Sequence, residues 1–196
     1  GDIAWFENDG TPNNDDWTKH DIDTSFLQAR NVDVVDLDRD GDLDVLGVAN
    51  TGDELAWWEN TATFSFDPSW TASDIDTNAD GAYAVFAADM DNDGDMDIVS
   101  ASYTDDTIAW YESNGAANPS WSAANIATNV DGAIDVHVAD MDNDGDLDIV
   151  SVSDNDEIIA WFENDGATDP SWSKSTIDTR DDEWPSAVYT GDMDND

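Results

Sequence analysis

The sequence predicts an all-β protein, a β-propeller of four-stranded blades, and three observations lead to this fold class. A unit of about 52 residues repeats: an acidic nonapeptide starts at residues 36, 89 and 140, and the first half of another copy starts at residue 192. Runs of β-branched, aromatic and small residues alternate with turn residues inside each unit. No run has the apolar spacing of an amphipathic helix. Four-stranded sheets at a constant period are typical of propeller blades, whereas a β-sandwich, the alternative, does not account for the repetition.

The second complete unit illustrates the assignment of the strands. Its four expected strands are residues 82–88, 96–103, 107–112 and 121–128. The nonapeptide joins the first two strands, residues 104–106 form a tight hairpin, and residues 113–120 form a longer loop marked by Asn-Gly and Asn-Pro. Neighbouring residues in the segments 84–87 and 98–101 are small or apolar, so both sides of these strands are expected to be packed.

Two tryptophan-containing elements recur with the same period. The expected third strand carries an Ile/Leu-Ala-Trp-aromatic-Glu block at residues 3–7, 55–59, 108–112 and 159–163. A second tryptophan introduces the fourth strand at Trp17, Trp70, Trp121 and Trp172. We therefore expect one repeat array over residues 1–196, divided into a partial blade (1–31), three blades (32–81, 82–132 and 133–182) and a final partial blade (183–196). Because a half-built blade leaves a strand edge open, we expect this array to be part of a larger propeller or of an assembly.

Composition excludes several classes of function. The chain of 196 residues carries 48 Asp and Glu against 5 Lys and Arg, a formal charge of −43. Nucleic-acid binding requires clustered cations, and an anionic membrane surface would repel this chain, so we expect neither partner. No apolar run approaches the roughly 20 residues that span a bilayer, so membrane insertion is not expected either. There are no cysteines, which removes disulfides and thiol chemistry, while 39% hydrophobic content supports a packed core.

The nonapeptide Asp-x-Asp-x-Asp-Gly-Asp-x-Asp predicts a metal-binding loop. Alternating short aspartates gather carboxylate oxygens around one point, and glycine in sixth place lets the backbone turn sharply, as loops that enclose a hard cation require. An EF-hand does not fit, because its twelfth position needs glutamate and these units have Gly47, Ser100 and Ser151 there. Two other interpretations remain: the aspartates are solvated turn formers, or the acidic composition also reflects adaptation to salt.

A family resemblance rests on two segments of the second unit. Residues 88–99 read Ala-Asp-Met-Asp-Asn-Asp-Gly-Asp-Met-Asp-Ile-Val, and residues 108–112 read Ile-Ala-Trp-Tyr-Glu. This pattern closely resembles the VCBS and FG-GAP repeats of surface proteins and, more distantly, of integrin alpha subunits. The resemblance implies a propeller with one Ca²⁺ in each complete loop. A clear Phe-Gly/Gly-Ala-Pro signature is missing, so the resemblance does not extend to integrin-like ligand binding.

The same resemblance implies which residues would hold the metal. The side-chain ligands would be Asp36, Asp38, Asp40 and Asp44 in the first loop, Asp89, Asp91, Asp93 and Asp97 in the second, and Asp140, Asp142, Asp144 and Asp148 in the third. The seventh residues, Asp42, Asp95 and Asp146, would contribute their backbone carbonyls. The incomplete last copy contains Asp192, Asp194 and Asp196.

The sequence favours a non-enzymatic protein located outside the cell or at its surface. Its two histidines, His20 and His137, have no counterparts in the other units, and no nucleophile, phosphate-binding or metalloprotease motif occurs. We expect a structural or adhesive module, including a building unit of a surface layer or fibre, with a protein or glycan partner at the cell surface or a second copy of itself. The alternative is a carbohydrate-binding propeller domain of a secreted protein, in which loop tryptophans such as Trp121 would stack on sugars.

Overall fold

The computed structural model describes residues 1–8, 10–11, 17–62, 68–179, 185–191 and 193. In these residues the regular structure consists of β-strands, and none of them belongs to a helix long and apolar enough to cross a membrane. The strands are β1 (Ile3–Glu7), β2 (Thr18–Asp23), β3 (Ala29–Val35), β4 (Asp44–Ala49), β5 (Glu54–Asn60), β6 (Trp70–Asp76), β7 (Ala82–Ala88), β8 (Asp97–Ser102), β9 (Thr107–Ser113), β10 (Trp121–Ala127), β11 (Ala133–Ala139), β12 (Asp148–Ser153), β13 (Ile158–Asn164) and β14 (Trp172–Thr179).

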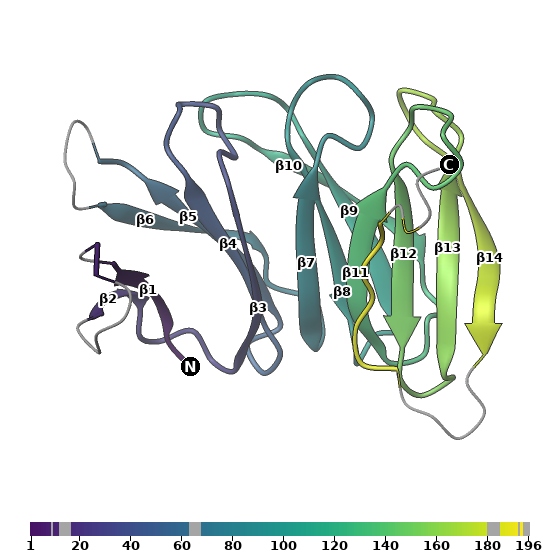
Figure 1. Cartoon of the computed structure of the whole chain (residues 1–196), viewed down its shortest axis with the longest axis horizontal. Coiled ribbons are helices and arrows are strands. Elements are labelled where there is room, and N and C mark those ends of the chain that lie inside the picture. The colour runs from purple at the N-terminus through teal and green to yellow at the C-terminus, as the bar shows by residue number, and fades with distance from the viewer. Residues whose placement is uncertain (9, 12–16, 63–67, 180–184, 192, 194–196) are drawn as a thin grey trace.

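The strands form three four-stranded antiparallel sheets and one two-stranded sheet. The orders β3-β4-β5-β6, β7-β8-β9-β10 and β11-β12-β13-β14 follow the chain, and β1 pairs with β2. The three complete sheets stand side by side as an open row of propeller-like blades (Figure 1). The all-β fold with blades repeating about every fifty residues, as expected from the sequence, is therefore confirmed.

Burial within each blade explains the composition of its strands. The second strands, β4, β8 and β12, are buried at every residue, since a neighbouring strand lies on each side and packing covers both faces. The fourth strands, β6, β10 and β14, are mostly exposed and accordingly polar. The sequence period thus places apolar residues near the inner side of each blade and polar residues at its outer edge.

The hydrophobic core lies between blades as well as within them. One cluster joins Trp57 of β5 to Val85 and Ile98 of the next blade. A second cluster joins Trp110 of β9 to Val136 and other residues of the third blade. Because large aromatic side chains occupy the same strand position in successive blades, each blade buries its neighbour's face.

Polar side chains also connect the first strands of adjacent blades. Asp33 of β3 accepts a hydrogen bond from the Ala87 backbone N–H at 2.9 Å. Asp135 of β11 accepts one from the Val188 backbone N–H at 2.7 Å. Residues 185–191 run beside β11 without forming a regular strand (Figure 1). They therefore lie where β7 lies relative to β3.

Strand limits differ slightly from those expected. The strands β7 and β11 begin at Ala82 and Ala133, where the second and third blades were expected to begin, but β3 begins at Ala29, so the expected boundary at residue 32 falls inside this strand. Strand β8 begins at Asp97 rather than at residue 96, because the nonapeptide continues up to Asp97. Loop and strand meet at the last residue of the motif, which sequence spacing alone does not resolve.

A glycine with left-handed backbone fixes the beginning of the second blade. Gly81 has φ +72°, and a Cβ added there would lie 2.9 Å from the Thr104 backbone nitrogen. The Gly81 backbone N–H donates to the carboxylate of Asp53, in the hairpin of the preceding blade, at 2.9 Å. Only glycine combines this backbone conformation with so close an approach of another chain segment.

Candidate metal centre

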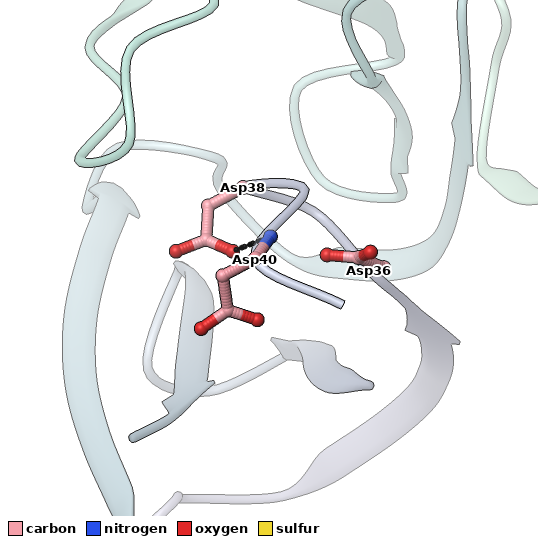
Figure 2. Close-up of side chains that lie close together, drawn as sticks. All are labelled: Asp36, Asp38 and Asp40. Carbon is pink, nitrogen blue, oxygen red and sulfur yellow. Dashed lines mark hydrogen bonds between the residues drawn. The ribbon is translucent and has the colours of Figure 1, made fainter. Parts of the chain in front are cut away.

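The three complete nonapeptides occupy the same place in successive blades. They join β3 to β4, β7 to β8 and β11 to β12, and so lie at the same end of each blade (Figure 1). Each loop is held by its own aspartates. Asp38 accepts a hydrogen bond from the Asp40 N–H at 3.1 Å (Figure 2), and Asp40 accepts one from the Asp42 N–H at 2.9 Å. Gly41 then takes φ +99°, the left-handed turn expected of the sixth position.

Carboxylates converge in each of these loops. Three aspartates per loop place one oxygen each within 4.8 Å of the others: Asp36, Asp38 and Asp40; Asp89, Asp91 and Asp97; Asp140, Asp142 and Asp148. Three negative charges at this separation repel one another, because at about 4 Å a pair of unit charges costs about 1 kcal/mol even in bulk water. The arrangement therefore suits a cation, and each repeat can hold a metal ion.

Two buried oxygen atoms support this fit. Oδ1 of Asp36 and Oδ1 of Asp89 are shielded from solvent and have no hydrogen-bond partner. The other oxygen of Asp36 accepts a hydrogen bond from the Gly41 N–H at 3.1 Å, so the carboxylate is held in one orientation. Buried polar atoms are almost always satisfied, and a metal ion could satisfy an unpartnered carboxylate oxygen inside an acidic loop. The donor set consists of hard oxygen atoms, as Ca²⁺ and Mg²⁺ prefer.

The ninth aspartate of each loop has a second, structural role. Asp97 is 1% exposed, and its two oxygens accept hydrogen bonds from the backbone N–H groups of Met90, at 3.1 Å, and Ser113, at 2.8 Å. Asp44 binds the equivalent N–H groups of Leu37 and Asn60, and Asp148 those of Met141 and Asn164, at 2.8–3.1 Å. This side chain therefore clamps the start of the loop to the end of the third strand.

Burial changes the protonation of two of these aspartates. It raises the pKa of the Asp44 and Asp97 carboxyls to about 6, although their backbone donors act in the opposite direction. Loss of hydration and the neighbouring carboxylates also raise the pKa of Asp38, Asp91 and Asp142. Both effects disfavour charge in the loop without a cation, and a bound cation would favour it.

The seventh aspartate connects one loop to the loop before it. Asp95 forms an ion pair with Arg39, the fourth residue of the preceding loop. Asp146 accepts a hydrogen bond from the side-chain amide of Asn92, which is again the fourth residue of the preceding loop, at 3.0 Å. Arg39 and Asn92 both have positive φ, 61° and 59°, so the two residues share one backbone conformation in their loops. Successive loops are thus in direct contact.

Comparison with protein-family models matches the FG-GAP-like repeat over residues 40–100, 89–151 and 140–196. The chain belongs to the FG-GAP-like repeat family. Each match runs from one acidic loop into the next, so the family unit includes the loop and the blade that follows it. This finding confirms the resemblance drawn from residues 88–99 and 108–112. A comparison with curated protein sequences gave no match.

The FG-GAP loops bring together most of the residues that the resemblance implied as ligands. The nine aspartates of the three triplets are among them. Asp44, Asp93 and Asp144 lie in the same loops but outside the triplets, and the seventh aspartates Asp42, Asp95 and Asp146 contribute no carboxylate to them. Asp192, Asp194 and Asp196 lie outside the described residues.

Sequence reasoning missed two features of these FG-GAP loops. The first is the clamp made by the ninth aspartate, whose partner Ser113 lies 16 residues further along the chain. The second is the contact between the fourth residue of one loop and the seventh of the next, 56 residues apart for Arg39 and Asp95. The only available signal was that the fourth position carries Arg or Asn, residues long or polar enough to reach a neighbouring carboxylate.

Both histidines and several of the described tryptophans have local packing roles. His20 stacks on Trp5 with ring centroids 4.2 Å apart. His137 packs between Phe86 and Tyr189, and burial lowers its pKa. Trp57 and Trp110 are buried in the clusters between blades, while Trp70, Trp121 and Trp172 are half-buried at the start of the fourth strands and pack against those clusters.

Proposed function

We propose that this protein is a non-enzymatic, calcium-binding propeller module that acts outside the cell or at its surface in a structural or adhesive role. Its partners would be a protein or glycan at the cell surface, or further copies of itself in a surface layer or fibre. One observation carries the proposal: the convergent triplets recur in successive blades, with buried unpartnered oxygens on Asp36 and Asp89. Because the same site recurs in successive blades, a bound ion would stabilise each of these blades in the same way, as a structural ion does.

Calcium suits these loops better than magnesium. Ca²⁺ accepts six to eight oxygen ligands in flexible geometry, whereas Mg²⁺ requires near-ideal octahedral geometry and retains its waters. Each loop supplies several carboxylates from a short, tightly turned segment. Extracellular calcium modules bind with dissociation constants of about 0.1 to 1 mM, so loops of this class would be filled outside cells.

The residues of the loop explain how the ion would stabilise a blade. Bound calcium would supply positive charge that offsets the repulsion among the clustered carboxylates. The first and third aspartates of the loop orient their oxygens inward through their hydrogen bonds to Gly41 and Asp40. The ninth aspartate, Asp97 in the second loop, connects the loop to the end of β9. Order in the loop is thereby coupled to order in the sheet.

The environment of the histidines supports a non-catalytic role. His137 lies 2.7 Å from the Thr190 hydroxyl and between two aromatic rings, so its imidazole is engaged in packing. His20 is stacked on Trp5 and lies 3.1 Å from Glu7. The charge of −43 supports a partner that is neither nucleic acid nor an anionic membrane.

A melting experiment tests the calcium role. If calcium is present at about ten times its dissociation constant, linkage contributes about 1.4 kcal/mol per site, or about 4 kcal/mol for three sites. We expect a chelator to lower Tm and calcium to restore it, with magnesium at equal concentration restoring much less. A melting curve that is the same in chelator and in calcium would refute the proposal. Sedimentation in calcium over a range of protein concentrations tests self-association.

A further inference from the structure

A cavity of about 520 Å³ lies at the opposite end of the blades from the acidic loops. It is lined by side chains at two repeated positions, the second residue of each first strand and the residue that follows each second strand. These residues are Arg30, Tyr83 and Ile134 at the first position, and Asn50, Tyr103 and Asp154 at the second, and Pro185 and Ser186 complete the lining. A volume of this size lies within the range of about 300–1,000 Å³ that is typical of small-molecule sites.

Arg30 and the two tyrosines form one side of the cavity. The Arg30 guanidinium lies over the Tyr83 ring, 4.7 Å from its centroid, and Nη1 donates to the Tyr83 hydroxyl at 3.5 Å. The Tyr103 ring lies 6.2 Å from that of Tyr83, tilted by 37°. Among the described residues, no carboxylate lies within ion-pair distance of Arg30. Its remaining N–H groups are therefore available to a ligand.

The lining residues differ between blades although their backbones are equivalent. The backbone N–H groups of Asn50, Tyr103 and Asp154 donate to Gln28, Gly81 and Gly132 in turn, at 2.9–3.2 Å, so the three residues occupy the same structural position. The acidic loops and core tryptophans, in contrast, keep the same residue in each blade. The repeat therefore does not fix the side chain at these two positions. The resulting asymmetric lining can match an asymmetric ligand.

The chemistry of the lining favours a neutral sugar. Tyrosine faces attract the C–H groups of a sugar ring, which carry slight positive charge. Arginine, asparagine and aspartate have planar polar groups that pair with neighbouring hydroxyls as donors and acceptors. The chain's charge of −43 and the presence of Asp154 in the lining oppose an anionic ligand such as a phosphate or uronate.

We propose that this cavity binds a neutral oligosaccharide, with Tyr83 and Tyr103 contacting the sugar rings and Arg30 and Asp154 pairing with the hydroxyls. The Asn50 amide nitrogen already donates to the Gly81 carbonyl at 3.2 Å, so Asn50 would accept from a hydroxyl through its amide oxygen. The proposal rests on the proposed function in one respect only: a location at the cell surface would be the source of the glycan. The site lies at the other end of the blades from the metal loops, and its residues are not the loop tryptophans considered in the sequence.

Binding of defined trisaccharides to the calcium-loaded chain tests this site. Isothermal titration would use maltotriose, cellotriose, mannotriose and N-acetylated chitotriose as neutral probes and trigalacturonate as an anionic probe. We expect at least one neutral probe to bind, and Arg30→Gln and Tyr83→Ala each to weaken that binding at least about tenfold. Lys174→Gln, on the exposed outer strand β14, removes the same charge away from the cavity and the acidic loops and should leave binding unchanged.

The outcomes separate this proposal from the calcium role. Arg30 is exposed, so Arg30→Gln should melt as the parent chain does, which keeps the test valid even if Tyr83→Ala fails to fold. Binding that is equal in the parent chain and Arg30→Gln, binding of trigalacturonate alone, or binding of none of the probes would overturn the sugar site. A chain that binds a neutral probe but melts identically with and without calcium would refute the calcium role and leave the sugar site standing.

Discussion

The dependence of the unfolding free energy on calcium concentration should reveal the number of metal sites. When calcium is well above its dissociation constant, each tenfold increase adds about 1.4 kcal/mol of unfolding free energy for every site that is filled only in the folded state. The structure brings together three carboxylate triplets. The expected slope is therefore about 4 kcal/mol per tenfold increase, which in a chain of this length corresponds to roughly 8 to 16 °C in Tm.

A single substitution should remove the contribution of one metal site to this slope. Asp91→Asn keeps the shape of the side chain and an oxygen that can accept the Asp93 N–H, now at 3.1 Å, but removes a charge from the second triplet. We expect the slope to fall to about 2.7 kcal/mol per tenfold increase, the value for two sites. Asp105→Asn, in the exposed hairpin, removes the same charge outside the triplets and should leave the slope unchanged.

Urea unfolding followed by tryptophan fluorescence provides the measurement, with calcium varied over two decades. Urea is preferable to guanidinium because a salt would screen the charges under study. Magnesium at the same concentrations corrects for general screening of the charge of −43. A slope near zero, or equal slopes for the parent chain and Asp91→Asn, would refute metal coordination by these triplets. A slope equal to that in magnesium would refute the preference for calcium.

Three further predictions follow from the same structure. Asp97→Ala should cost about 2 to 4 kcal/mol even in chelator, because two buried backbone N–H groups lose their acceptor, whereas Asp105→Ala should cost less than about 0.5 kcal/mol in urea unfolding. Because burial raises the pKa of Asp44 and Asp97 to about 6, the folded chain binds more protons than the unfolded chain between about pH 4 and 6. In chelator, these groups should make Tm fall as pH rises through that window, while added calcium should raise Tm more at pH 7 than at pH 5. Gly81→Ala should destabilise the chain by at least about 2 kcal/mol, because a Cβ there combines left-handed backbone strain with a 2.9 Å approach to the Thr104 nitrogen.

Each of these predictions has an outcome that contradicts its reasoning. Equal unfolding free energies for Asp97→Ala and the parent chain in chelator would show that the buried clamp contributes nothing without metal. A Tm in chelator that rises from pH 4 to 6 would mean that other groups dominate the proton balance. A Gly81→Ala variant as stable as the parent chain would show that the Thr104 segment moves away at no cost.

Much of the fold could be predicted because it is encoded locally and repeated. Alternation of apolar and polar residues, turn residues at fixed offsets and the spacing of the tryptophan blocks place each strand within a few residues of its observed limits. The left-handed turn at Gly41 also follows from the motif, because the loop is short and the turn involves only its own residues. Three tandem copies reinforce the same interpretation, which no single copy could do.

The sequence by itself determined the blade period, the strand order within a blade and the position of the acidic loops. It also determined which aspartates belong to the same loop. Tertiary structure decided which aspartates converge, that Asp97 is buried and clamps Ser113, that Arg39 reaches Asp95, and that residues of three blades line one cavity together with Pro185 and Ser186. The physical reason is the range of the interactions. A turn depends on neighbours a few residues away, whereas burial, clamping and the contacts between blades depend on how one repeat packs against the next, about fifty residues along the chain.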